Sequence, residues 1–203
     1  MPAPERLINT LRRYVSDERV LAAIAEVPRD RFVPPDLRAE AWENIPLPIG
    51  SGQTISQPLV VARMCELLEL SGDEKVLDVG TGSGYHAAVL ARLARHVHSI
   101  EVHESLSRTA AESLRAAGVE NVTLEVGDGT RGLPRHAPYE AINVAAAAGG
   151  AIPTALAEQL APGGRLVAPV EAGEQRLVVA RSTPAGVTLT ELERVRFVPL
   201  VGS

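Results

Sequence analysis

Helical spacing of apolar and charged positions dominates the first part of the chain. It runs from about residue 4 to residue 27, with Ser16-Asp17 as a break and a helix cap. Pro28 and the pair Pro34-Pro35 then interrupt any helix, because proline lacks a backbone N–H and clashes with the preceding turn. The pattern therefore predicts helices followed by an extended, looping stretch to about residue 52.

From Lys75 onward, short apolar runs alternate with helical segments. The expected strands are 76–79, 97–101, 122–126 and 141–145, with helices at 87–94, 104–117 and 153–160 and later strands at 165–170, 176–181 and about 187–198. Gly118 ends the second of these helices and Pro162-Gly163-Gly164 the third. This alternation predicts an α/β fold: a doubly wound, mostly parallel sheet with antiparallel C-terminal strands and an N-terminal helical and loop extension.

Composition and charge narrow the class of protein. The chain has 203 residues, of which 45% are hydrophobic and 22% charged, as in an ordinary soluble domain. Aromatic residues make up 3% and the net charge is −5, so we expect no nucleic-acid partner. No apolar run approaches the roughly 18 residues of a membrane span, and the N-terminus lacks the apolar core of a signal peptide. We therefore expect no membrane partner and a cytoplasmic location.

The candidate metal-binding side chains are few. One cysteine, Cys65, excludes an intrachain disulfide and a cysteine-based metal cluster, and its helical surroundings indicate a small buried hydrophobe. His96 and His98 can project from one face of a strand, but no third ligand is evident nearby. We predict no metal.

A glycine-rich turn follows the first strand of the expected sheet, in Asp78-Val79-Gly80-Thr81-Gly82-Ser83-Gly84. Glycines let the backbone approach a ligand without a Cβ clash. The spacing is G-x-G-x-G rather than the G-x-G-x-x-G of dinucleotide binding, and Tyr85 stands where the last glycine of that pattern would be. The turn therefore need not accommodate a pyrophosphate.

Acidic residues follow the next two strands. Glu101 ends the second strand, where a carboxylate can accept both hydrogen bonds of a ribose diol. Asp128, in Gly127-Asp128-Gly129, follows the third strand in a loop that could reach an adenine ring. Ligands bind at the carboxyl ends of the strands in such a sheet. Together with Asp78, these acids form a negative lining that suits the sulfonium of S-adenosylmethionine, which predicts a methyltransferase-type site.

Residues 42–58 have no clean period and are rich in proline, glycine and small polar side chains. From the residues alone, the segment is an ordinary surface loop leading into a helix that begins near Pro58, with Ser56 as its N-cap. Backbone amides at such a helix start also bind carboxylates well, so a binding role stays open.

Several motifs together resemble the protein-L-isoaspartate O-methyltransferase family, over nearly the whole chain. The most specific are Gln53-Thr54-Ile55-Ser56 and Phe197-Val198-Pro199-Leu200. The others are Val27–Pro34, Leu47–Gly50, Val76–Tyr85, Gly127–Gly129, Ala137–Tyr139, Gln159-Leu160, Gly163–Leu166 and Val195-Arg196. A glycine-rich turn alone could belong to any methyltransferase.

The resemblance implies roles for named positions. Ser56 would be the active-site serine beside the substrate carboxylate and the methyl donor, with Thr54, Ile55 and Ala145 as further substrate-binding residues. The implied cofactor-binding residues are Asp78, Gly80, Gly82, Glu101, Asp128 and Gly129. The family frequently has Thr where this chain has Ala145, so the missing hydroxyl could alter substrate preference. Glu140 and His86, where Asp and Gln are common, are milder departures.

The resemblance also implies one methyltransferase domain over residues 1–203. Residues 1–58 would carry the N-terminal helices and the active-site loop, and residues 59–203 the cofactor-binding core. The implied activity is methyl transfer from S-adenosylmethionine, leaving S-adenosylhomocysteine, to the α-carboxylate of L-isoaspartyl residues in damaged proteins and peptides. The methyl ester would cyclise to a succinimide, whose hydrolysis regenerates some aspartate. Two alternatives stay open: a dedicated carboxyl methyltransferase of one peptide, and a non-catalytic S-adenosylmethionine-binding protein. We expect a monomer.

Overall fold

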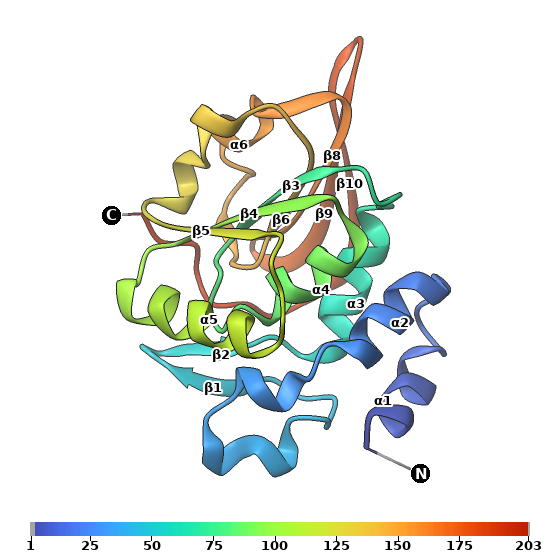
Figure 1. Cartoon of the computed structure of the whole chain (residues 1–203). Coiled ribbons are helices and arrows are strands. Elements are labelled where there is room, and N and C mark those ends of the chain that lie inside the picture. The colour runs from blue at the N-terminus through green and yellow to red at the C-terminus, as the bar shows by residue number, and fades with distance from the viewer. Residues whose placement is uncertain (1–2, 203) are drawn as a thin grey trace.

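The computed structural model describes residues 3–202 and has an α/β architecture (Figure 1). Within these residues, a sheet of eight strands has the order β10-β9-β8-β6-β3-β4-β5, and the short β7 pairs with β8. The strands are β3 (Lys75–Val79), β4 (His96–Glu101), β5 (Val122–Val126), β6 (Tyr139–Val144), β7 (Ala148–Gly149), β8 (Leu160–Ala172), β9 (Glu174–Thr183) and β10 (Gly186–Arg194). Neighbours from β5 to β8 are parallel and the last three strands are antiparallel, which confirms the predicted fold class.

Helical segments cover both faces of this sheet. On one face, α4 (Tyr85–Leu93) and α5 (Glu104–Ala116) follow β3 and β4. They contribute Val89, Leu90 and Leu114 to a hydrophobic cluster, called here the first cluster, which also includes buried residues of the N-terminal section. The other face carries a second hydrophobic cluster, which includes Leu77, Ile142 and Leu156. It lies under α6 (Thr154–Ala157) and the 3-10 turns η3 (Gly129–Arg131) and η4 (Pro134–His136). The central strands are therefore buried on both sides, which is why they read as short continuous apolar runs.

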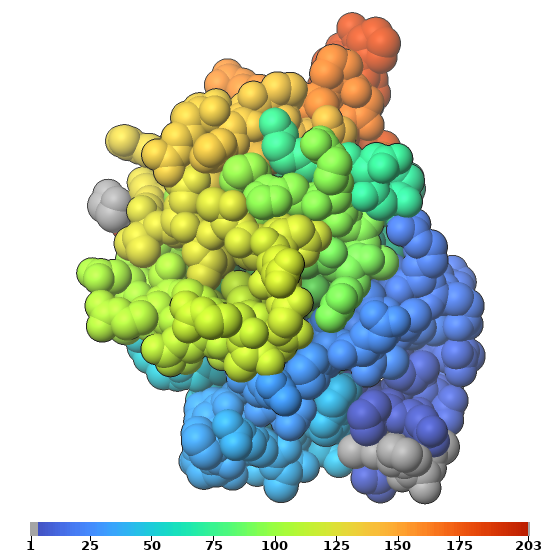
Figure 2. Space-filling view, in the orientation of Figure 1, coloured from blue at the N-terminus to red at the C-terminus, as the bar shows by residue number. Residues whose placement is uncertain are grey.

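The N-terminal helices form as the sequence predicts. α1 (Ala3–Leu11) and α2 (Glu18–Glu26) are separated at Asp17, whose side chain caps α2 by accepting the first free N–H groups of that helix. Their apolar sides pack with α3 (Pro58–Leu67) and α4 in the first cluster, and Cys65 is buried there as expected. The space-filling view shows this section, in blue, against the green central part of the chain (Figure 2).

The expected extended stretch after α2 is wrong in detail. It contains two 3-10 turns, η1 (Arg29–Phe32) and η2 (Pro35–Glu40), and then an antiparallel hairpin of β1 (Leu47–Gly50) and β2 (Gln53–Ile55). Ser56 is not the N-cap of α3, because Pro58 is the first helical residue and Gln57 precedes it. The hairpin instead places Ser56 directly after a strand.

Two boundaries in the last third also differ from expectation. α6 is a single turn, and Pro162-Gly163-Gly164 lies inside β8, where the register against β6 shifts and the extra residues bulge out. β10 ends at Arg194 rather than near residue 198. The residues after it run back across the sheet edge, where Pro199 forms an isolated parallel bridge with Ala147.

A buried arginine ties the N-terminal section together. Arg29 has no exposed surface, and its guanidinium donates to the backbone carbonyls of Ala41 at 2.8 Å and Ser56 at 2.9 Å, with a longer bond to Ile45 at 3.3 Å. It also lies 4.7 Å over the ring of Tyr85, the first residue of α4. One side chain thus joins three irregular segments to the helix α4.

Replacing Arg29 by methionine should lower the free energy of unfolding by about 3 kcal/mol or more, because two or three buried carbonyls lose their donor. Arg29→Lys should recover little of this loss, since a single ammonium cannot reproduce the planar fork. Urea denaturation measures both. Arg38→Met, at an exposed arginine of η2, is the matched control and should leave stability unchanged. Equal losses in the Arg29 and Arg38 variants would contradict this role.

Candidate active site

The carboxyl ends of β3, β4 and β6 and the turn after β5 converge on one hollow, called here the first hollow. It is lined by Gln53, Thr54, Val79, Gly80, Gly82, Ile100, Glu101, Val102, His103, Gly129, Ala145, Ala146 and Val198–Val201. Parallel strands of such a sheet present ligand sites at this edge. The structure therefore brings together four of the predicted cofactor positions, Gly80, Gly82, Glu101 and Gly129.

The glycine turn after β3 follows a course that other residues rarely adopt. Gly80 and Gly82 have φ of +92° and +53°, in the left-handed region that favours glycine. The N–H of Gly80 donates to the carbonyl of Ile100 at 2.9 Å, which fixes the turn against β4. The backbone of the turn is thereby exposed to a ligand in the first hollow.

Glu101 supports the same turn from the end of β4. Its two carboxylate oxygens accept the N–H of Gly82 at 2.8 Å and the N–H of His103 at 3.0 Å, and the residue is buried. Each carboxylate oxygen has a further lone pair. Since Glu101 also lines the hollow, it fits a ligand that offers two adjacent hydroxyl groups, as a ribose does.

Asp78 lies beneath the hollow rather than in its lining. It has no exposed surface, and its carboxylate accepts hydrogen bonds from Ser99 Oγ and Asn143 Nδ2, each at 2.7 Å. Burial is the main cause that raises the pKa of Asp78 to about 6, against the lowering effect of those two hydrogen bonds. Its role as a direct cofactor ligand stays a prediction, and the contacts make it a support of the turn.

The support is a chain of buried polar groups that the sequence did not reveal. Thr81 Oγ1 lies 2.6 Å from Ser99 Oγ and must donate, because the hydrogen of Ser99 is used on Asp78. On the other side, Asn143 Nδ2 lies 3.2 Å from His86 Nδ1, and His86 Nε2 lies 3.5 Å from Cys65 Sγ. Burial lowers the pKa of His86 to about 3, so this imidazole is neutral.

Asp128 and Gly129 open the turn after β5. The Asp128 carboxylate caps η3 by accepting from the N–H and the hydroxyl of Thr130, at 2.9 and 2.6 Å. Gly129 lines the hollow, and a Cβ there would lie 2.7 Å from Val79 Cγ1, so the turn can lie this close to β3 only with glycine. Contact of Asp128 with an adenine ring stays a prediction.

A second hollow adjoins the first on the side of the β1–β2 hairpin. It is lined by Pro46, Thr54, Ser56, Gln57, Val60, Ala145 and Arg194–Pro199. Thr54, Ala145, Val198 and Pro199 line both hollows, so the two meet there, with Thr54 and Ala145 on the side of the hairpin and the sheet. Ser56 and Ile55 also share a small cavity with Gly80 and Gly82, although Ile55 is buried in the first cluster. The four predicted substrate positions thus lie together, and their contact with a substrate stays a prediction.

Residues 195–201, named here the C-terminal wall, close both hollows. Its backbone is held at Ala147, which donates to the carbonyl of Val198 and accepts from the N–H of Leu200, each at 2.8 Å. The Gln175 side chain binds the backbone of Phe197 on both sides, accepting its N–H at 2.7 Å and donating to its carbonyl at 3.2 Å. Sequence reasoning used this segment only as a family motif and missed its position in the site and its anchor on Gln175.

A family model described as Protein-L-isoaspartate(D-aspartate) O-methyltransferase (PCMT) matches residues 3–203. The chain belongs to this family. It is 53% identical over 194 residues to the protein-L-isoaspartate O-methyltransferase of Roseiflexus castenholzii, covering 95% of this chain and 88% of that one. It is 53% identical over 200 residues to that of Halorhodospira halophila, covering 97% and 90%.

Solved structures agree with this membership. A protein-L-isoaspartate O-methyltransferase superposes with a TM-score of 0.88 at 27% identity, covering 98% of this chain and 66% of that one. A Plasmodium falciparum protein described as a proposed protein-L-isoaspartate O-methyltransferase (PCMT), crystallised with S-adenosyl-L-homocysteine, has a TM-score of 0.83 at 23% identity. The alignment covers 98% of both chains and shows the shared fold. The resemblance stated from the motifs is confirmed.

The pKa of Asp78 predicts a pH-dependent stability. The folded carboxyl holds its proton up to about pH 6 and the unfolded one only to about 3.8, so its stabilising contribution is complete below pH 3.8 and is lost as the pH rises through 6. Between pH 4.5 and 7.5 the free energy of unfolding of the wild type should fall by about 2 kcal/mol relative to Asp78→Asn.

Urea denaturation across this pH range measures the difference. Asp73→Asn, at an exposed carboxyl five positions earlier, should run parallel to the wild type. Parallel curves for the wild type and Asp78→Asn would show that the Asp78 carboxyl does not titrate with a raised pKa.

Proposed function

We propose that this chain carries out the reaction of its family with its two hollows as the two reactant sites. It transfers a methyl group from S-adenosylmethionine to the α-carboxylate of L-isoaspartyl residues in proteins and peptides. The following backbone amide nitrogen then attacks the ester carbonyl, which closes a succinimide and releases methanol. Hydrolysis of the succinimide converts a fraction of the damaged residues to aspartate. The observation that carries this proposal is the meeting of the hollows at Thr54 and Ala145, with Ser56 beside the glycine turn, in a chain that belongs to this family.

The first hollow suits S-adenosylmethionine by the chemistry of its lining. Glu101 offers carboxylate lone pairs to a ribose, and the turn at Gly80 and Gly82 lets the backbone approach the ligand closely. Because Gly129 has no Cβ, the turn after β5 can pack close to Val79 of β3, which leaves this space open. When bound, S-adenosylmethionine supplies an electrophilic methyl group. The polypeptide must place that group at the border of the two hollows.

The second hollow presents the substrate carboxylate. A carboxyl group with an ordinary pKa of about 3.3–3.9 is ionised at neutral pH and needs no base to become a nucleophile. Ser56 reaches this hollow, where its hydroxyl can donate to one carboxylate oxygen and orient the other toward the methyl group. Arg29 fixes the backbone of Ser56 through its carbonyl. His86 takes no part as a base, since it is buried and engaged with Asn143 and Cys65.

The oligomeric state and the cellular location of the enzyme are part of the same proposal. We infer a monomer that works in the cytoplasm: both hollows are lined by one chain, and Cys65 is a buried thiol that suits a reducing compartment. Within residues 3–202 no helix has the length and apolarity needed to cross a membrane.

The decisive experiment compares methyl transfer to two matched peptides, one with L-isoaspartate and one with aspartate. The wild type should label only the isoaspartyl peptide. Ser56→Ala should lower kcat by about a hundredfold, because the carboxylate loses its orientation, while S-adenosylmethionine affinity changes little. Ser105→Ala, at an exposed serine of α5, should behave as the wild type. Labelling of neither peptide, with cofactor binding intact, would refute the repair activity, and equal loss of kcat and cofactor affinity would refute the role of Ser56.

Glu101→Gln tests the proposed role of Glu101 in binding S-adenosylmethionine. The amide supplies a single acceptor oxygen where the carboxylate serves the N–H groups of both Gly82 and His103, so S-adenosylmethionine affinity should fall about ten- to a hundredfold. Isothermal titration with S-adenosylhomocysteine avoids turnover. Glu104→Gln, at an exposed carboxylate in the same segment, is the control. Unchanged affinity in Glu101→Gln would place the ribose elsewhere.

A further inference from the structure

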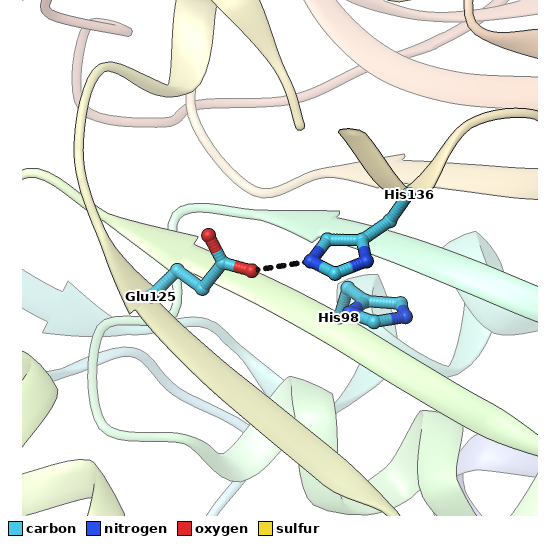
Figure 3. A group of neighbouring side chains, drawn as sticks. All are labelled: His98, Glu125 and His136. Carbon is cyan, nitrogen blue, oxygen red and sulfur yellow. Dashed lines mark hydrogen bonds and ion pairs between the residues drawn. The ribbon is translucent and has the colours of Figure 1, made fainter. Parts of the chain in front are cut away.

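The fold gathers three metal-ligating side chains away from the two hollows. His98 of β4, Glu125 of β5 and His136 of η4 each offer one ligand atom, and these atoms all lie within 4.8 Å of one another (Figure 3). None of the three lines either hollow. The sequence pattern offered only His96 and His98 with no third ligand, whereas the structure adds a carboxylate and an imidazole from later segments.

The sheet register explains this grouping. β4 and β5 are parallel, with His98 opposite Thr123 and Ile100 opposite Glu125. Since side chains alternate between faces along a strand, His98 and Glu125 point to the same face. η4 crosses that face and stacks the ring of His136 on the ring of His98, with 4.2 Å between centroids and 18° between planes. Two of the three side chains thus lie on strands of the sheet, and the third lies on η4, which covers that face.

The polar groups of this cluster are incompletely satisfied. His98 is about nine-tenths buried, and its Nδ1 has no hydrogen-bond partner. Glu125 accepts from His136 Nε2 at 2.9 Å and from Arg135. Buried imidazole nitrogens are ordinarily partnered, and an ion would meet this need.

We propose that His98, Glu125 and His136 form a site for a divalent transition-metal ion of the zinc class. Two imidazoles and one carboxylate are a known zinc donor set, with a fourth position left for water, and imidazole nitrogens disfavour magnesium and calcium. Ligand atoms around a tetrahedral zinc lie roughly 3.4 Å apart, so the cluster needs to contract by at most about 1.4 Å. Because the rings of His98 and His136 are stacked at 18° to each other, binding would require rotation of at least one ring and of the Glu125 side chain.

The bound ion would fasten η4 to the sheet. The loop between Glu125 and His136 also carries Gly129, which lines the first hollow, so the ion would hold one boundary of that hollow from behind. Arg135 competes with the ion, because it pairs with Glu125 and its Nε also lies 3.2 Å from His136 Nε2. Its side chain is 68% exposed and can turn into solvent. The Lys75 ammonium lies 5.5 Å from the ring centroid of Tyr139 and adds positive charge nearby.

Zinc titration of the untagged full-length chain, against a chromophoric chelator, tests the site. The wild type should bind one equivalent. His136→Ala and Glu125→Gln should each weaken binding by at least about tenfold, because the first removes a ligand and the second replaces a carboxylate by a weaker, neutral amide. Arg135→Gln should tighten binding severalfold, because it frees both Glu125 and His136 Nε2. Arg108→Gln removes an equally exposed arginine that pairs with Glu104 on α5 and should leave zinc affinity unchanged.

A thermal melt separates loss of a ligand from loss of the fold. Zinc should raise the Tm of the wild type and of Arg135→Gln, but not that of His136→Ala, whose metal-free melt should remain cooperative. The site is refuted by the absence of saturable zinc binding, or by wild-type affinity in both ligand variants. It is also refuted if Arg108→Gln tightens binding as much as Arg135→Gln, which would indicate a general charge effect.

Discussion

The burial of one guanidinium sets the arrangement of the N-terminal section and, through it, of the active site. Segments without regular structure leave carbonyls unpaired, and such groups are costly to bury. Arg29 satisfies carbonyls of Ala41, Ile45 and Ser56 at once, while the face of Tyr85 offsets part of its charge. Because Tyr85 begins the helix after the glycine turn, the serine and the turn are positioned through the same cation.

A second set of contacts supports the site from the sheet side. Asp78, Ser99 and Thr81 connect β3, β4 and the glycine turn through side chains that the ligand need not touch. Glu101 adds a direct contact from the turn to the hollow. The sequence predicted that the three acidic residues form one negative lining, but in the structure each has a different role. Asp78 orders the backbone, Asp128 caps η3, and Glu101 alone of the three lines the hollow.

The regular part of the fold could be predicted because its signals are local. The strands at 76–79, 97–101 and 122–126 are apolar runs bounded by turn residues, and the structure places β3, β4 and β5 within one residue of them. The hairpin of β1 and β2 was missed because Pro48 and Gly50 hide any alternation. The bulge in β8 was missed because Pro162-Gly163-Gly164 reads as the end of an element.

The site was predictable only in part, for a related reason. The motifs identified residues that belong to the family, but hydrogen bonds between distant segments decide which side chains face a hollow. Asn143, Gln175 and His136 sit in ordinary strand or turn surroundings, and nothing local distinguishes them. Arg29 likewise lies in a recognisable motif, yet its burial depends on carbonyls 12 to 27 positions away.

The C-terminal wall has a thermodynamic consequence. Residues 198 and 199 line both hollows, and the segment is held by a few backbone bonds to Ala147 and by the side chain of Gln175. Under the proposed function, a peptide that displaced this segment would change the enclosure of the nucleoside, and a nucleoside that ordered it would change the shape offered to the peptide. Linkage requires these two effects on affinity to be equal. The C-terminal wall can thus couple the two hollows, so that binding in one changes the affinity of the other.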